Sequence, residues 1–133
     1  MKALKARITR ALPRGSRIAV CDNSGAKIIR LISVKNLHTV KGRLQSAGVS
    51  DLVVASVISG TPEMRKQVVS AIIVRQKKEY RRPDGTRIKF EDNAAVVLKD
   101  EKGSPKGTSF KGPIAKEATE RWPSVAKIAS IIV

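Results

Sequence analysis

The sequence has few of the side chains on which metal sites and cofactor sites depend. Its 133 residues include one cysteine, Cys21, and one histidine, His38. A single thiol excludes an internal disulfide and a zinc site built on several thiolates, so we expect Cys21 to be a small buried side chain. His38 has no Cys or Glu at ligand spacing, which predicts a loop contact or a side chain without a role. Neither a metal ion nor a cofactor is expected.

Groups for acid–base or nucleophilic catalysis are equally scarce. The pairs Glu91-Asp92 and Asp100-Glu101 are adjacent in sequence. Adjacent residues on a strand point to opposite faces, so neither pair suits shared acid–base work. A hydrolase with Ser24 as its nucleophile would need a glycine two residues earlier, where this chain has Asp22. The sequence therefore predicts a protein that is not an enzyme and has no small-molecule substrate.

Long apolar runs are also missing. No stretch approaches the roughly 20 apolar residues of a membrane-spanning helix, and the apolar part of residues 1–10 is too short for a secretory signal. An anionic membrane surface is the alternative partner, but the amphipathic basic helix that usually binds one is not expected in a curved β domain. We therefore expect a cytoplasmic protein without membrane contact.

Acidic residues are few, because 11 Asp and Glu stand against 27 Lys and Arg, for a formal net charge of +16. Hydrophobic residues make up 41% of the chain, so it is expected to fold rather than stay a disordered polycation. The default partner is a polyanion, and nucleic acid is the commonest one. With only 3% aromatic residues, base stacking is disfavoured and cationic contacts to RNA phosphates are favoured.

Short β-branched runs alternate with turn signals along the first hundred residues. This spacing is typical of a small, mostly antiparallel barrel. The expected strands cover residues 18–22, 27–34, 51–59, 68–74 and 94–98, with a polar loop over 35–50. From Met1 to Arg17 there are six basic residues and no acidic one, and this segment is compatible with a strand or with an arm lying on a partner.

The stretch before the last of these strands predicts a projecting basic β-hairpin. Its turn, Arg82–Thr86, has the residue order of a type I turn closed by a glycine bulge. Pro83 presets φ, Asp84 can bond its own backbone, and Gly85 supplies the left-handed residue. Apolar and cationic residues then alternate over 87–90, as in a strand with two unlike faces.

The chain after residue 100 predicts a loop and two short helices. Phe110 is expected to pack inward from a segment rich in Gly, Lys and Ser. Residues 114–122 have helical spacing, Pro123 ends that helix, and a second one follows over 125–130. Trp122 and the apolar end of the chain are expected in the core, and the end alternatively forms a protein-docking surface. We expect one domain, 1–133, with the barrel over 1–100 and the helices within 101–133.

A long pattern in the middle of the chain resembles the signature of the universal large-subunit ribosomal protein fourteen family. It reads Ala71-Ile-Ile-Val74, nine residues, Asp84-Gly85, four residues, Phe90, two residues, Asn93, two residues, Val96-Val97. Residues 19–27 and 107–116 are similar to two further family blocks in the expected order. The basic start, Met64–Gln67 and the end of the chain depart from the bacterial pattern and are similar to the archaeal branch.

The resemblance implies a closed five-stranded barrel that acts as a structural constituent of the large ribosomal subunit. It further implies binding to large-subunit rRNA and a bridge to small-subunit rRNA across the subunit interface. The implied protein partners are universal large-subunit protein three and the anti-association initiation factor. A free-standing RNA-binding or translation factor on the same barrel is the alternative, and it would leave washed subunits whereas a constituent would stay.

The resemblance also implies three sets of site residues. The expected rRNA contacts are Arg7, Lys27, Lys41, Arg43, Lys66, Arg75, Lys77, Lys78, Arg81, Arg82 and Arg87. The expected turn residues are Asn23, Gly25, Asp84, Gly85 and Asn93. The expected protein-docking residues are Lys116, Arg121 and Trp122.

Overall fold

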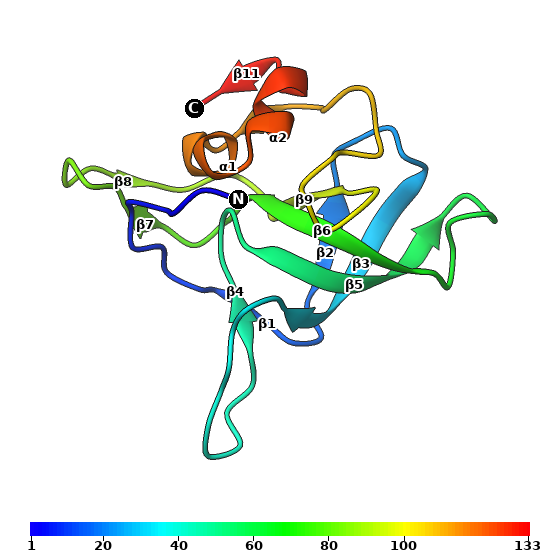
Figure 1. Cartoon of the computed structure of the whole chain (residues 1–133), viewed down its shortest axis with the longest axis horizontal. Coiled ribbons are helices and arrows are strands. Elements are labelled where there is room, and N and C mark those ends of the chain that lie inside the picture. Colours follow the sequence, from blue (N-terminus) through cyan, green and yellow to red (C-terminus); the bar gives the residue numbers. More distant parts are fainter.

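A closed barrel of five strands forms the centre of the computed structural model, which describes residues 1–133 (Figure 1). The strands follow one another around the barrel in the order β2-β3-β5-β6-β9. They are β2 (Arg17–Val20), β3 (Ala26–Val34), β5 (Leu52–Gly60), β6 (Val68–Arg75) and β9 (Ala94–Val97). The predicted mainly β, five-stranded barrel is confirmed.

One strand pair departs from the antiparallel expectation. β2 pairs with β9 in parallel, with Ala19 opposite Ala94, whereas the other four neighbouring pairs are antiparallel. Topology requires this exception. Directions cannot alternate completely around a closed ring with an odd number of strands, so one pair must run the same way. Closure leaves no exposed sheet edge on the barrel.

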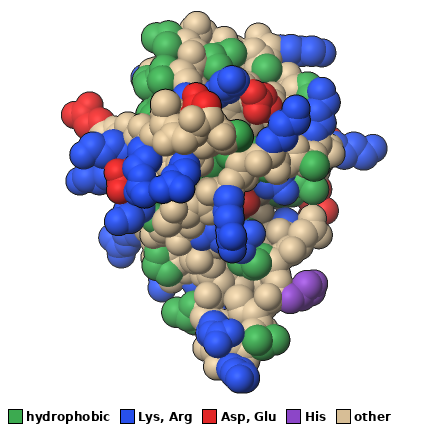
Figure 2. All heavy atoms as spheres, turned by 90° about the vertical axis from the view of Figure 1, so that its left-hand side faces the viewer, with side chains coloured by type: hydrophobic (Ala, Val, Ile, Leu, Met, Phe, Trp, Pro, Cys, Tyr) green, Lys and Arg blue, Asp and Glu red, His purple; other side chains and the backbone are tan.

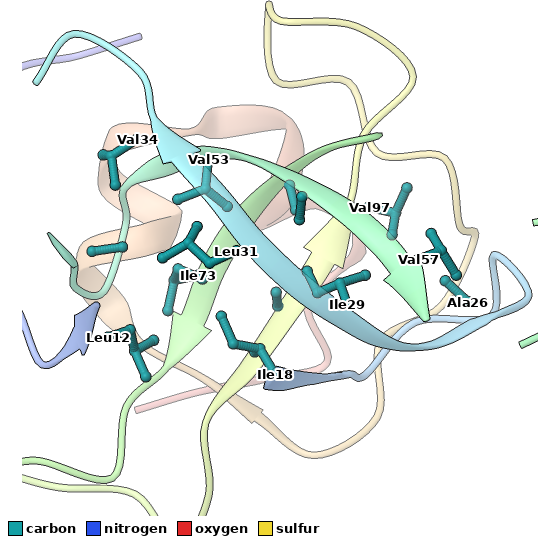
Figure 3. Packing of buried hydrophobic residues seen from close by; sticks show 14 of the residues in the cluster. Leu12, Ile18, Ala26, Ile29, Leu31, Val34, Val53, Val57, Ile73 and Val97 are labelled. Carbon is teal, nitrogen blue, oxygen red and sulfur yellow. The ribbon is translucent and has the colours of Figure 1, made fainter. Parts of the chain in front are cut away.

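The barrel is filled by aliphatic side chains that alternate inward along each strand (Figure 3). On β3, Ile29 and Leu31 are buried while Arg30 between them is exposed, which is the period-two pattern of a strand with one wet face. Ile73 from β6 and Val53 from β5 meet them inside. The interior is therefore a core of packed aliphatic side chains.

A second core joins the barrel to the end of the chain. Helices α1 (Lys116–Arg121) and α2 (Pro123–Ile128) lie over the outside of β6 and β9 (Figure 1). Trp122 is buried between them, and its indole Nε1 donates a hydrogen bond to the carbonyl oxygen of Ser50 at 2.8 Å. Phe110 also packs inward, as expected. Neither helix has the length and apolar character needed to cross a membrane.

Three expectations for the end of the chain were wrong. The second helix begins at Pro123 and ends at Ile128 rather than covering 125–130, because proline is well suited to the first position of a helix. The first helix starts at Lys116 rather than residue 114, because β10 (Pro113–Ile114) pairs in parallel with β11 (Ile131–Ile132). The terminal residues Ile131–Val133 are exposed and do not enter the core. They lie on the outer side of this two-stranded ribbon, where barrel side chains do not reach.

Two projections leave the barrel (Figure 1). The basic hairpin, residues 80–88, contains β7 (Tyr80–Arg81) and β8 (Arg87–Ile88) and extends to the left. The distal loop, residues 35–45, extends downward between β3 and β4 (Ser46–Ala47), and β4 pairs with β1 (Leu12–Pro13). Apart from β1, the first sixteen residues form no strand and lie along the hairpin side of the barrel.

Candidate nucleic-acid interface

Basic side chains cover the face that carries the hairpin. Figure 2 shows this face, on which Lys and Arg side chains far outnumber Asp and Glu. The structure contains only seven ion pairs, so most of the 27 basic side chains have no carboxylate partner. Unpaired cations on a rigid scaffold are free to bind an external polyanion.

A groove of about 490 Å³ runs between the hairpin and residues 5–9 of the N-terminal segment. We call it the basic groove. It brings together four of the predicted rRNA contacts from distant parts of the chain, and one cation that was not predicted. Its basic lining residues are Lys5, Arg7, Arg81, Arg82 and Arg87.

The hairpin wall of this groove is fixed by a buried carboxylate on α1. Glu117 accepts hydrogen bonds at 2.8 Å from the hydroxyl of Tyr80 and from Nε of Arg82. Arg82 also donates through Nη2 to the backbone oxygen of Val133 at 2.6 Å. Burial, followed by the hydrogen bond to Glu117, raises the pKa of Tyr80 above its ordinary value. The first strand of the hairpin is thereby tied to the C-terminal elements, from Tyr80 at its base to Arg82 at the turn.

The opposite wall is fixed by a buried amide. Gln76 is fully buried, and its Nε2 donates to the backbone oxygens of Thr9 at 2.9 Å and Lys78 at 3.0 Å. Its Oε1 accepts from the backbone N–H of Val49 at 3.2 Å. Ile8 packs beside Tyr80 in a small apolar cluster. The N-terminal segment at Ile8 and Thr9 therefore lies against the barrel of the same chain, whereas its sequence was compatible with a strand or with an arm on a partner.

Arg75 does not fit the role that its sequence position suggested. Its side chain is 10% exposed and pairs with Asp92 at 2.9 Å. Nη1 donates to the backbone oxygens of Lys111 and Pro113 at 2.8 and 3.0 Å. With its donors engaged inside the fold, Arg75 joins β6 to the segment that leads to α1, and we exclude it from the interface. Lys77 and Lys78, just beyond it, are exposed.

The other predicted contacts lie outside the groove. Lys41 and Arg43 are exposed at the tip of the distal loop. Lys41 and Gly42 both have positive φ, and the N–H of Arg43 donates to the oxygen of Val40 at 3.3 Å, as in a type I′ turn. Lys27 and Lys66 are exposed near the far end of the barrel, where the N–H of Thr61 donates to the oxygen of Gly25.

The predicted turn residues lie at chain reversals. The N–H of Gly85 donates to the oxygen of Arg82 at 2.9 Å, with φ at +90° for Gly85, and Asp84 Oδ1 accepts from the N–H and the hydroxyl of Thr86. These two bonds lower the pKa of the Asp84 carboxyl. Asn23 bonds the backbone of Thr108, Asn93 bonds the N–H of Lys77, and Gly25 has a φ of +102°. Asp84 and Gly85 therefore shape the hairpin turn, whereas Asn23 and Asn93 join segments that are distant in the sequence.

The predicted docking residues are mostly engaged within the fold. Trp122 is 2% exposed, and Arg121 contacts Asp51 at 3.4 Å with a side chain that is 20% exposed. Burial raises the pKa of Asp51, and the hydrogen bond from Gly48 opposes the rise. Of the three, only Lys116 is well exposed. Trp122 and Arg121 therefore hold α1 against the barrel.

Sequence reasoning missed Lys5 and Glu117. Lys5 and Arg7 are two residues apart, and in an extended segment residues at that spacing point to the same side, so the pair carried a readable signal. Glu117 lies three residues after Ile114 in the first predicted helix. That position borders the apolar stripe, where a carboxylate is ordinarily exposed, so no local signal marked its burial.

The remaining chemistry of the surface is simple. All four aromatic side chains are buried: Tyr80, Phe90, Phe110 and Trp122. No group of three or more His, Cys, Asp or Glu side chains is arranged to hold a metal ion. Burial raises the pKa of the Cys21 thiol to about 11, which keeps it in its unreactive form near neutral pH. These features define a class: a small basic β-barrel whose surface carries many unpaired cations and no exposed aromatic ring.

Comparison with known proteins identifies the member of this class. The sequence model of the ribosomal protein L14p/L23e family matches residues 11–133. Large ribosomal subunit protein uL14 of Methanococcus vannielii is 58% identical over 132 residues, which are 99% of each chain. The protein of that name from Nanoarchaeum equitans is 59% identical over 133 residues and 100% of each chain.

The chain belongs to the ribosomal protein L14p/L23e family. It is a structural constituent of the large ribosomal subunit, located in the cytoplasm within the ribosome, and it is not an enzyme. The resemblance to the universal large-subunit protein fourteen family, in its archaeal form, is confirmed. Membership favours a resident constituent over the free-standing factor.

Proposed function

We propose that this protein binds large-subunit rRNA through the face that carries the basic groove. The observation that carries the proposal is the convergence of Lys5, Arg7 and Arg81, which have no carboxylate partner, on one groove. The distal-loop cations Lys41 and Arg43, together with Lys77 and Lys78 below the hairpin, extend the contact beyond it. Contacts from these residues to phosphates position the protein on folded RNA without reading its sequence.

A bridge to small-subunit rRNA is the second part of the proposal. The far end of the barrel carries Lys27 and Lys66, which lie away from the hairpin and cannot contact the same RNA phosphates. Two separated cationic surfaces suit a protein held between two RNA bodies. We propose that the groove face meets the large subunit and that the far end meets the small subunit.

The protein partners are proposed on the C-terminal side. Ile131, Ile132 and Val133 are exposed apolar residues on one edge of the β10–β11 ribbon. Lys116 lies beside them, because its N–H donates to the backbone oxygen of Val133 at 2.9 Å. An apolar patch flanked by a cation is typical of a protein-docking surface. We propose that this patch docks the anti-association factor and that universal large-subunit protein three is a further neighbour.

The test measures the binding constant K for large-subunit rRNA at several salt concentrations and compares two variants that each lose one positive charge. Arg81→Ala removes an unpaired groove cation, and Lys127→Ala removes an exposed cation on α2. We expect Arg81→Ala to weaken rRNA binding and to reduce the slope of log K against log salt by about one unit per lost phosphate contact. Lys127→Ala should leave the slope unchanged. Equal slopes for both variants and the parent protein would mean that the hairpin points away from the RNA.

A further inference from the structure

We propose that the basic groove holds the sugar–phosphate backbone of an unpaired RNA segment, with its bases outside the groove. This inference rests on the proposed rRNA binding and narrows it to one RNA structure at one site. A docking of duplex RNA across the hairpin is the competing arrangement, and the experiments below separate the two.

The charges within the groove identify the ligand as a phosphate chain. Arg82 and Arg87 line it but are partly neutralised by Glu117 at 2.8 Å and Glu79 at 3.0 Å. The other three basic lining residues, Lys5, Arg7 and Arg81, are exposed and form no ion pair. Three uncompensated cations around one groove match several consecutive phosphates better than a single anion.

A second hollow of about 290 Å³ adjoins the basic groove beside α1 and shares Lys5, Arg82 and Pro83 with it. Its lining is mixed, because Lys5, Arg82 and Lys116 line it together with Asp84, Glu117 and Glu120. A phosphate chain is therefore attracted more strongly to the basic groove, whose lining includes Arg7 and Arg81 and no carboxylate. This difference in charge favours a short segment in the basic groove over a long straight one that continues toward α1.

Both walls are held in place before any ligand arrives. Glu117 fixes Tyr80 and Arg82 on the hairpin side, and Gln76 fixes Thr9 on the N-terminal side. Ile8 adds an apolar anchor beside Tyr80. Because buried side chains hold both walls, the backbone that carries the groove cations loses little conformational entropy on binding.

The groove has no exposed aromatic side chain, and this bears on where the RNA bases lie. Tyr80 lines the groove, but it is 1% exposed and its hydroxyl is bound to Glu117. Proteins that take bases into a groove stack them on exposed aromatic faces. A concave site that has cations and no exposed ring suits a backbone, and a flexible unpaired strand enters a concavity more readily than a stiff duplex, whose phosphates lie on a convex surface.

The first experiment measures RNA binding by the full-length protein. The groove variant is Lys5→Ala/Arg7→Ala/Arg81→Ala, and the matched control is Lys99→Ala/Lys102→Ala/Lys127→Ala, which removes the same charge elsewhere. Each is titrated by fluorescence anisotropy with a single-stranded RNA and with the blunt duplex of the same sequence, at several salt concentrations. For the single strand, we expect the groove variant alone to lose about two units of salt slope, because each phosphate contact contributes about 0.7.

Two outcomes would overturn the proposal. Equal losses for the groove variant and its control would show that only net charge matters. A loss confined to the duplex would show that the site takes paired RNA. The variant Arg7→Lys/Arg81→Lys keeps both charges and should retain most of the slope, which separates charge from misfolding.

The second experiment locates the RNA in the assembled subunit. Ala6 lines the groove, and Cys21 is the only native thiol and is buried with a pKa of about 11. An iron chelate coupled to Ala6→Cys therefore labels one site. We expect hydroxyl-radical cleavage of rRNA in an unpaired segment. Cleavage only within paired helices, in subunits that retain the protein after a high-salt wash, would refute the inference alone; loss of the protein in the wash would refute the proposed rRNA binding itself.

Discussion

The two basic projections of this barrel are built in different ways. The first strand of the hairpin is fixed by buried Glu117, which accepts hydrogen bonds from Tyr80 and Arg82. The distal loop is held mainly by Gln45, whose side chain accepts from the N–H of Val34 at 2.9 Å and donates to the oxygen of Leu37 at 2.6 Å. Beyond Gln45, residues 38–44 are exposed.

The hairpin and the distal loop therefore carry their exposed cations in two different ways, one on a fixed segment and the other on a loosely held one. The hairpin cations meet their ligand from a preformed surface, so binding costs them little entropy. The loop cations lie on a segment with few buried contacts, which places that segment at the low end of local stability. The loop is therefore suited to adapt to RNA, and the hairpin is suited to define the register of the whole protein on it.

The strongest test of the comparison removes the hairpin anchor. Glu117→Ala should lower the free energy of unfolding by about 3 kcal/mol, because it leaves the Tyr80 hydroxyl and the Arg82 guanidinium without their buried partner. Urea unfolding followed by circular dichroism measures the change. Glu120→Ala on the same helix is the control. The Glu120 carboxylate is half-exposed, and its distance of 3.7 Å from Lys116 Nζ is long for an ion pair. The free energy of unfolding should therefore change by no more than about 0.5 kcal/mol. If both variants lose the same free energy of unfolding, the buried hydrogen bonds of Glu117 do not stabilise the hairpin more than a surface ion pair does.

The same anchor predicts the titration of the single tyrosine. The raised pKa of Tyr80 means that the folded protein holds the phenol proton more tightly than the unfolded chain does. The resulting stabilisation is complete below the ordinary tyrosine pKa near 10 and is lost as pH rises above it. Tyrosinate absorbance at 295 nm should therefore rise only together with the loss of β structure. In denaturant the ordinary pKa should return; ionisation near pH 10 in the folded protein would contradict the buried geometry.

The distal loop should respond more weakly to the loss of its own support. Gln45→Ala removes two hydrogen bonds from a half-buried side chain, and we expect a cost of about 1–2 kcal/mol. Limited trypsin digestion gives the local readout, since Lys41 and Arg43 lie in the exposed tip. Cleavage there should precede cleavage in the hairpin, and Gln45→Ala should accelerate it. Earlier cleavage at Arg81 would reverse the order of rigidity that the contacts imply.

Much of the fold could be predicted because each strand carries its own signal. Alternation such as Ile29, Arg30, Leu31 is local, and so is the turn chemistry of Pro83-Asp84-Gly85. Barrel closure followed from the spacing and number of such runs together with the family resemblance. The parallel pairing of β2 with β9 follows from the odd strand number, which is a property of the closed ring rather than of any segment.

The site was predicted only in part because burial is decided by distant residues. Arg75 and Arg81 are both arginines in one cationic stretch, and nothing near either distinguishes them. Asp92 and the carbonyls of residues 111 and 113 draw Arg75 inside, whereas Arg81 meets no such partners. Trp122 likewise finds its acceptor in Ser50, far away in the sequence. Local sequence patterns cannot predict these contacts, because each contact joins residues that are far apart in the sequence.

The smallest expected effect is a gain in stability at the tip of the distal loop. Lys41 occupies the left-handed region at a φ of +57°, next to Gly42 at +72°. Asn-Gly is the favoured pair for such a type I′ turn, because Asn adopts positive φ at lower cost than Lys. Lys41→Asn should therefore raise the free energy of unfolding by about 0.5 kcal/mol while it removes one loop charge. Lys99→Asn, which removes the same charge at an ordinary φ, is the control.

Lys41→Asn changes the stiffness and the charge of the distal loop together, and Lys99→Asn controls only for the net charge of the protein. We expect Lys41→Asn to weaken RNA binding through the lost phosphate contact and to slow trypsin cleavage at Arg43, whereas Lys99→Asn should leave that cleavage unchanged. A Lys41→Asn protein that is no more stable than the control would mean that the strain at residue 41 is relieved within the loop. The loop would then be softer than its turn geometry implies, which would widen its contrast with the hairpin.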